Sequence, residues 1–232
     1  MLYQTLNGET FTLSAAILEL TYLVAAILFV IGLKLLSHPE TAKKGNIWAA
    51  SGMILAMIST LFLHEGDDGE SIALTNGIVV VLTILIAGVL GWIIARRVKM
   101  TAMPQLVSFF NATGGIASGL VALMEYPGTA NTGILIVTLL GLTIGSISFS
   151  GSLIAYGKLD GKVGDIRASA MKYVNIFLLV IVVGMIVYLS SVPTDTAGAL
   201  IYGLFVISLL YGVLFVMPIG GADMPVVISL LN

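Results

Sequence analysis

The segment SAAILELTYLVAAILFVIGLKLL, residues 14–36, contains one acidic residue, Glu19, and no basic residue before Lys34. As an α-helix it is long enough to cross the ~30 Å hydrocarbon core of a bilayer, which needs about 20 residues. Similar apolar runs follow at residues 46–63, 72–95, 103–124, 131–156, 171–191 and 196–217. The sequence therefore predicts an all-α fold, a polytopic transmembrane helix bundle with seven full spans.

A last apolar run, MPVVISLLN, covers residues 224–232 and reaches the end of the given sequence. A helix of this length rises only ~13 Å, less than half of the hydrocarbon core. We expect it to be the first half of an eighth span, and residues 1–232 to be the transmembrane domain of a longer chain. The alternative is a short re-entrant or interfacial tail.

The composition excludes several other classes of protein. Hydrophobic residues make up 58% of the chain and charged residues 9%, and there is no Cys. A disordered chain needs low hydrophobicity and high charge, and a disulfide scaffold needs cysteines. With a net charge of -2, the chain has no excess of positive charge for binding nucleic acid. We therefore expect its surroundings to be the lipid bilayer.

The basic residues are confined to alternate connections between the predicted helices. They are Lys34, Lys43, Lys44, Arg96, Arg97, Lys99, Lys158, Lys162, Arg167 and Lys172. The other connections are acidic, as in HEGDDGE at residues 64–70, which we interpret as a solvated loop rather than a metal site. Because cytoplasmic loops of membrane proteins are rich in Lys and Arg, we expect the N-terminus outside the membrane.

Residues 103–124 form the least apolar of the predicted spans. Small and polar residues recur on one helical face, at Ser108, Asn111, Gly115, Ser118 and Ala122. Asn111 would lie ~12 Å into the membrane, where an amide needs hydrogen-bond partners. This face either holds helices together or lines a solvated transport path.

The segment MPQLVSFFN at residues 103–111 aligns without gaps with MPVVISLLN at residues 224–232. Both predicted helices run outward, so they form a parallel repeat, and such repeats frame midplane sites in many transporters. We hypothesise that Asn111 and Asn232, together with Ser108 and Ser229, border one polar path. Chance similarity between apolar segments is the alternative.

Further candidate residues have structural explanations as well. Small residues on one face of residues 131–156 predict close helix packing, at Gly141, Gly145, Ser148 and Ser152. Glu19 lies near the outer surface, where it either reaches water or contributes to a proton path. Asp223, after Gly220 and Gly221, either caps the last helix or couples it to the cytoplasmic side; the two roles are compatible.

Several stretches resemble the membrane domain of the beta subunit of proton-translocating NAD(P) transhydrogenase. They are PIGGADMPVVISLLN (218–232), MTAMPQLVSFFN (100–111), FSGSLIAYGKLDGK (149–162) and HPETAKKGNIWAASGMILA (38–56). The similarity covers nearly the whole chain in the same order. It implies that the chain corresponds to the first seven and a half spans and lacks the C-terminal helices and the cytosolic NADP(H)-binding domain.

The resemblance also implies an activity. In this family, hydride transfer between NAD(H) and NADP(H) is coupled to proton movement across a bacterial cytoplasmic (inner) membrane. NADP(H) would bind in the missing domain and NAD(H) in the alpha subunit, so this segment would hold no hydride-transfer site, cofactor or metal. The expected partners are the alpha subunit or subunits, including their membrane helices, and a second protomer in a dimer.

The resemblance assigns roles to three positions. Asp223 matches an acidic residue linked to communication with the NADP(H) domain, and Asn232 matches a channel-lining asparagine. Asn111 stands where many members carry a histidine that is regarded as the proton carrier. Asparagine does not titrate near neutral pH, so we expect a histidine from an alpha-subunit helix to replace it. The competing functions are an ion-coupled secondary transporter and a non-conducting helical scaffold.

Overall fold

The computed structural model describes residues 4–6, 9–11, 13–64, 74–128, 131–166, 170–192 and 197–231. Its helices are α1 (Leu13–Leu36), α2 (Ala42–Leu63), α3 (Leu74–Arg97), α4 (Met103–Glu125), α5 (Thr132–Leu159), α6 (Met171–Ser191), α7 (Gly198–Val216) and α8 (Met224–Leu231). Within the described residues, 7 helices are long and apolar enough to cross a membrane, and α8 is shorter. This confirms the all-α fold with seven spans and a shorter eighth helix.

The helix limits differ little from the spans read from the sequence, and the difference at α2 has a clear reason. This helix begins at Ala42 rather than at residue 46. Lys43 and Lys44 are charged and therefore do not belong to an apolar run, but they continue the helix beyond it.

A short β-hairpin, which the apolar runs in the sequence do not predict, precedes α1. Strands β1 (Gln4–Leu6) and β2 (Glu9–Phe11) pair antiparallel, with Gln4 opposite Phe11. It lies outside the apolar runs and leaves the helical class unchanged.

The chain divides into two compact units, and the first is Met1–Ile93. Within it, α1 packs against α2 at glycines. A Cβ added to Gly45 would lie 2.6 Å from the carbonyl oxygen of Gly32, and one added to Gly52 would lie 3.0 Å from that of Ala25. Real Cβ atoms essentially never approach as closely as at Gly45 and rarely as closely as at Gly52, so glycine permits this contact between the two helix backbones.

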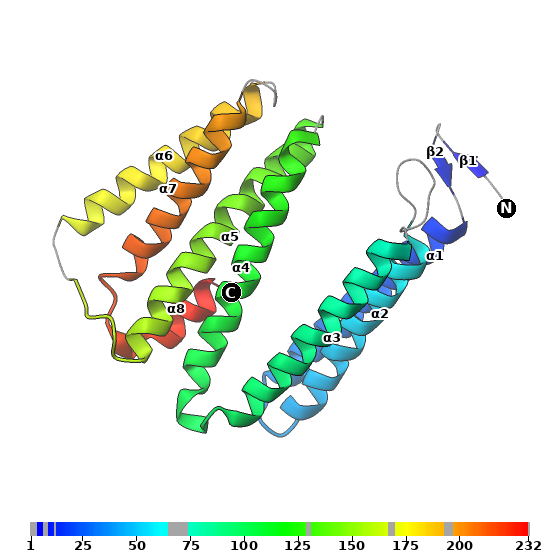
Figure 1. The fold of residues 1–232 in the computed structure, drawn as a ribbon, viewed down its shortest axis with the longest axis horizontal. Coiled ribbons are helices and arrows are strands. Elements are labelled where there is room, and N and C mark those ends of the chain that lie inside the picture. The colour runs from blue at the N-terminus through cyan, green and yellow to red at the C-terminus, as the bar shows by residue number, and fades with distance from the viewer. Residues whose placement is uncertain are drawn as a thin grey trace. The chain divides into compact units, whose positions relative to one another are not determined.

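The second unit, Ile94–Asn232, is built around α5. Helix α5 packs against α4, α6, α7 and α8, and Figure 1 shows α4 alongside it and the red α8 near its end. The buried apolar core joins α5, α6 and α7, with Leu139, Leu142, Leu189 and Leu204 all fully buried. This central position lets α5 contact both members of the sequence repeat, α4 and α8.

Local sequence signals explain where these helices begin and end. Pro104 occupies the first turn of α4, where a missing N–H costs nothing. The Asn131 side chain caps α5 by accepting hydrogen bonds from the backbone N–H groups of Gly133 and Ile134, at 2.8 and 3.3 Å. After α5, Gly161 adopts a positive φ of 71°, which a glycine tolerates without steric cost.

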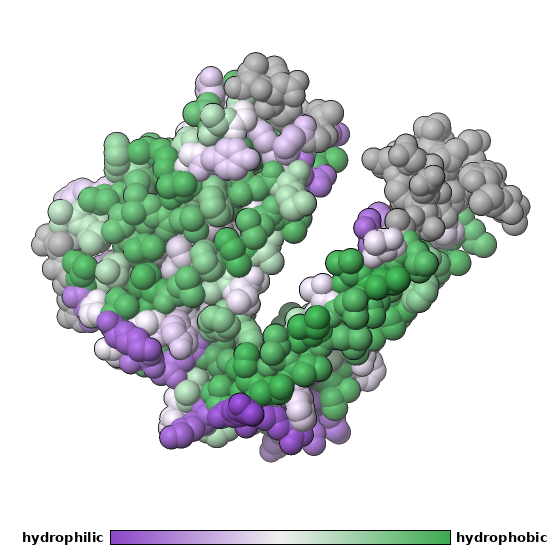
Figure 2. All heavy atoms as spheres, in the orientation of Figure 1, coloured by the Kyte–Doolittle hydropathy of each residue, from purple (hydrophilic) through white to green (hydrophobic). Residues whose placement is uncertain are grey.

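Apolar side chains cover the flanks of the helices in each unit, and hydrophilic residues gather at helix ends (Figure 2). Of the residues of α3, none is buried within the chain, although apolar residues such as Leu82 and Trp92 dominate it. A soluble protein rarely exposes such large apolar surfaces, whereas lipid accommodates them.

Candidate functional site

Asn111 on α4 is half-buried and faces two serines of α5. Its amide Nδ2 donates to the hydroxyl oxygen of Ser152 at 2.9 Å and to that of Ser148 at 3.3 Å. Ser152 is fully buried and Ser148 is 6% exposed. The amide therefore has protein partners within a helix that is long and apolar enough to cross a membrane.

Two further hydrogen bonds extend this group. The Ser108 hydroxyl, on α4, donates to the backbone oxygen of Ser152 at 2.7 Å. The Ser148 hydroxyl donates to the backbone oxygen of Leu231, on α8, at 2.8 Å. We call Ser108, Asn111, Ser148, Ser152 and the Leu231 carbonyl the polar cluster. It joins α4, α5 and α8, and thus both copies of the repeat, through α5.

Glycines bring α4 and α5 close together one turn from Asn111. A Cβ added to Gly115 would lie 2.7 Å from the carbonyl oxygen of Gly145, and one added to Gly145 would lie 2.6 Å from that of Gly115. The short Asn111 side chain can reach α5 because the two backbones nearly touch here. Gly145, predicted as a packing residue, lies at this contact.

The structure places two predicted path residues outside the polar cluster. Ser118 is exposed beside the α4–α5 contact. Ser229 is also exposed, and its hydroxyl donates to the Pro225 carbonyl of its own helix at 3.1 Å. Asn232, which was paired with Asn111 by the repeat, lies outside the described residues.

The two copies of the repeat present different faces to α5. In α8 the buried residues are Met224, Val227 and Ile228, whereas Ser229 is exposed. In α4 the corresponding serine, Ser108, is fully buried. The sequence similarity therefore predicts two helices that contact α5, but the rotation of each helix about its axis depends on how it packs.

The remaining predicted residues lie elsewhere. Glu19 is on an exposed face of α1 in the first unit. Asp223 and Gly221 are exposed in the turn that begins α8, and Gly220 is partly buried there. A Cβ added to Gly141 would meet no atom within 4 Å, so this glycine lies in open space rather than at a helix contact.

Sequence reasoning missed three residues that organise the same region. The Gln105 amide donates to the Leu159 carbonyl at 2.9 Å, linking the start of α4 to the end of α5. A Cβ added to Gly212 would lie 2.6 Å from the Ile147 carbonyl, so this glycine fixes the contact of α7 with α5. Lys158 is buried and has three partners, described below. Of these three, Gln105 has a signal in the sequence, because it is a polar residue opposite the apolar Val226 in the repeat.

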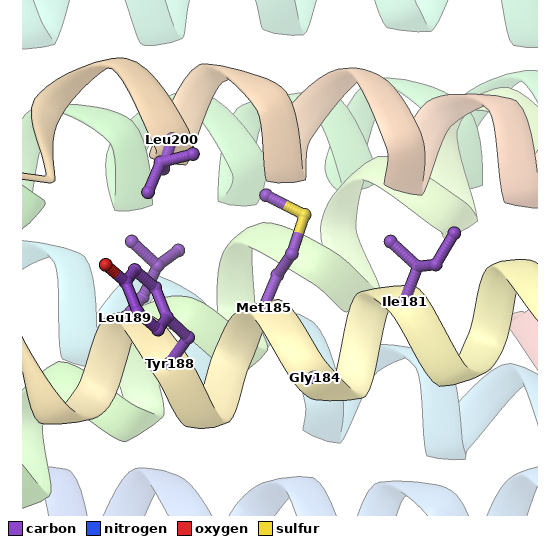
Figure 3. A pocket seen from close by; sticks show the side chains of 6 residues that line it. All are labelled: Ile181, Gly184, Met185, Tyr188, Leu189 and Leu200. Carbon is purple, nitrogen blue, oxygen red and sulfur yellow. The ribbon is translucent and has the colours of Figure 1, made fainter.

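A groove of about 220 Å³ lies between α6 and α7 (Figure 3). Its lining includes Ile181, Met185 and Leu189 from α6 and Leu200 from α7. These residues are apolar and are not part of the polar cluster. Among the described residues, no group of three or more His, Cys, Asp or Glu could hold a metal ion.

Comparison with known proteins assigns the chain to a family. The family model described as NAD(P) transhydrogenase beta subunit matches residues 18–232. The chain belongs to this family. Two curated relatives named NAD(P) transhydrogenase subunit beta, from Rhodospirillum rubrum and from a strain of that species, are each 38% identical to it over 221 residues.

The alignments cover 91% of this chain and 46% of each relative. The chain therefore spans about half the length of the transhydrogenase beta subunits that it matches. Together with the seven apolar helices, this relationship identifies the chain as a transmembrane part of a beta subunit.

Proposed function

We propose that this chain forms the proton-translocating membrane part of NAD(P) transhydrogenase, coupling hydride transfer between NAD(H) and NADP(H) to proton movement. The observation that carries the proposal is the polar cluster, in which Asn111 links α4 to α5 and Ser148 links α5 to α8. Amide and hydroxyl groups at membrane depth can bind water. They can therefore line a proton path without changing their own protonation state.

The proposed mechanism is conformational. Nucleotide binding and redox state in an NADP(H)-binding domain, which would follow this segment in the complete subunit, alter the position of α8. Because the Leu231 carbonyl accepts from Ser148, such a shift changes the hydrogen bonds available to Asn111. Access to the cluster then alternates between the two faces of the membrane. Asp223, at the start of α8, is the proposed contact with that domain.

The titrating group is proposed to come from a partner. Asn111 remains neutral at all physiological pH values, because a carboxamide does not titrate in this range. We therefore propose that a histidine on a membrane helix of the alpha subunit faces Asn111. The complex would be a dimer of such protomers in a bacterial cytoplasmic membrane, with NAD(H) bound by the alpha subunit.

The proposal is tested in the complete enzyme, with both subunits, reconstituted into sealed vesicles with its nucleotide sites outside. NADPH and an oxidised NAD analogue are added, and analogue reduction and lumen pH are recorded together. We expect reduction to acidify the lumen. Reduction without any pH change in the unmutated enzyme would leave this chain as a scaffold.

Substitution of Asn111 separates the path from simple helix packing. Asn111→Leu removes the two hydrogen bonds to Ser148 and Ser152 but keeps the side-chain volume similar. We expect proton movement per hydride to fall by about tenfold or more, since loss of the amide donor leaves buried serine hydroxyls unsatisfied, which costs about 1–3 kcal/mol. Nucleotide binding should be unchanged. A variant that is less stable but equally coupled would support the scaffold function instead.

A further inference from the structure

Lys158 is a charged residue in the last turn of α5, and its side chain is only 1% exposed. From the sequence it belongs to the positive loops, where Lys side chains normally reach water. Burial of an ammonium group is costly unless charged and polar partners compensate for its lost hydration. A positive charge in a cytoplasmic loop therefore does not by itself explain why the Lys158 side chain is buried.

All three donors of the Lys158 ammonium are used. Nζ donates to the Asp165 carboxylate at 2.9 Å and to the backbone oxygens of Met217 and Ile219 at 2.6 and 2.7 Å. Asp165 belongs to the loop after α5, and Met217 and Ile219 belong to the linker between α7 and α8. One side chain thus ties three segments together. The cation also lies at the C-terminal end of α7, where the helix dipole favours positive charge.

The linker held by Lys158 leads directly into α8. Ile219 is followed by Gly220 and Gly221, which impose little conformational restriction, and α8 begins at Met224. Met224 is fully buried and packs in a cluster with Ala155 of α5. The start of α8 is therefore fixed to α5 by the lysine and by this apolar contact.

The other end of α8 meets the polar cluster. Leu231 accepts from Ser148, which precedes Lys158 on α5 by ten residues, or ~15 Å of helix. A Cβ added to Gly151 would lie 2.9 Å from Cδ1 of Leu231, so the Leu231 side chain packs directly against α5 here. A displacement at the Lys158 end would therefore alter the contact at Ser148.

We propose that Lys158 is a positioning residue for proton translocation. Its ammonium holds the linker 217–219 against α5 and so sets where α8 meets Ser148 and, through it, Asn111. It does not touch the transferred proton. This inference rests on the proposed function, because it assigns Lys158 to the coupling of that same polar cluster.

The same loop contains a matched control pair. Lys162 and Asp160 form an ion pair at 2.6 Å, but the Lys162 side chain is 75% exposed. The hydrogen bond and charge of Asp160 raise the pKa of Lys162. Exposed pairs of this kind contribute little to stability. Substitutions in the two pairs change the same residue types in neighbouring positions at the end of α5 and in the loop after it, but only Lys158 contacts the linker.

The test uses the complete reconstituted enzyme and two measurements, protons moved per hydride and hydrogen exchange of backbone amides in 217–231. In Lys158→Met we expect exchange to rise and coupling to fall by about tenfold or more, as for loss of a charged buried hydrogen-bonding group. Asp165→Asn keeps the two carbonyl contacts of Lys158. It should therefore raise exchange and lower coupling, but by less than Lys158→Met does. Lys162→Met and Asp160→Asn should match the unmutated enzyme.

If Lys158→Met does not fold, Asp165→Asn tests the positioning role of Lys158 in its place. Leu189→Ala, in the fully buried core of α6, tests whether lost stability alone uncouples the enzyme; we expect it to remain coupled. The inference is overturned if Lys158 and Asp165 variants behave like their controls, or if Leu189→Ala uncouples equally. If the unmutated enzyme moves no protons, the proposed function fails. The role of Lys158 in translocation then fails with it; raised exchange in Lys158→Met would show only that the lysine holds the linker, and unchanged exchange would exclude that as well.

Discussion

At the scale of single residues, fully buried serines of the second unit differ in what their hydroxyls do. Ser108 donates to the Ser152 carbonyl at 2.7 Å. Ser208 on α7 is equally buried, but its hydroxyl has no hydrogen-bond partner among the described residues. A buried polar atom without a partner costs about 1–3 kcal/mol, whereas a satisfied one contributes about 1 kcal/mol.

These two serines lead to opposite expected effects of the same substitution. Ser208→Ala should raise the free energy of unfolding by about 1 kcal/mol, because it removes an unpaired hydroxyl. Ser108→Ala should lower it by about 1 kcal/mol, because it removes a hydrogen bond. Denaturant unfolding of the purified protein in detergent measures both. Destabilisation of similar size in both variants would mean that Ser208 does have a partner.

At the scale of elements, the contact between α4 and α5 depends on Gly115 and Gly145. Lipid tails are as apolar as buried side chains, so close packing and interhelical hydrogen bonds drive helix association in membranes. At this contact both are present, since the glycines allow the backbones to approach and Asn111 donates to Ser148 and Ser152.

Adjacent glycines of α4 provide the test of this contact. In Gly115→Ala the new Cβ would lie 2.7 Å from the Gly145 carbonyl, so the helices must separate. We expect a loss of about 1–3 kcal/mol of stability, typical of overpacking, together with weakened coupling. Gly114→Ala is the control, because its Cβ would meet nothing within 4 Å. Equal stability of the two variants would argue against the glycine contact.

At the scale of the whole molecule, the arrangement of charge predicts orientation in the membrane. Basic residues occur in alternate connections, and acidic residues dominate the others. Because the chain has no Cys, single cysteines can report which side each connection faces.

The positive-inside pattern predicts opposite labelling at two positions. Asp67→Cys should react with a membrane-impermeant maleimide in intact cells. Lys99→Cys should react only after the membrane is opened. Labelling of Lys99→Cys in intact cells, at the level seen for Asp67→Cys, would reverse the proposed orientation.

The sequence by itself determined the helical class, the number of spans and the family, because these depend on local apolar runs and on specific motifs. An apolar run of about 20 residues predicts a spanning helix whatever its neighbours are. The polar character of Asn111 and its need for partners were likewise readable, as was close packing at Gly145.

Only the tertiary structure decided which face of each helix is buried. In a membrane, the face toward lipid and the face toward protein are both apolar, so hydrophobic periodicity does not distinguish them. For this reason Ser229 is exposed although its repeat counterpart Ser108 is buried, and Gly141 has open space although Gly145 is in contact. The buried position of Lys158 likewise depends on carbonyl groups about 60 residues away in the sequence, which no local pattern reveals.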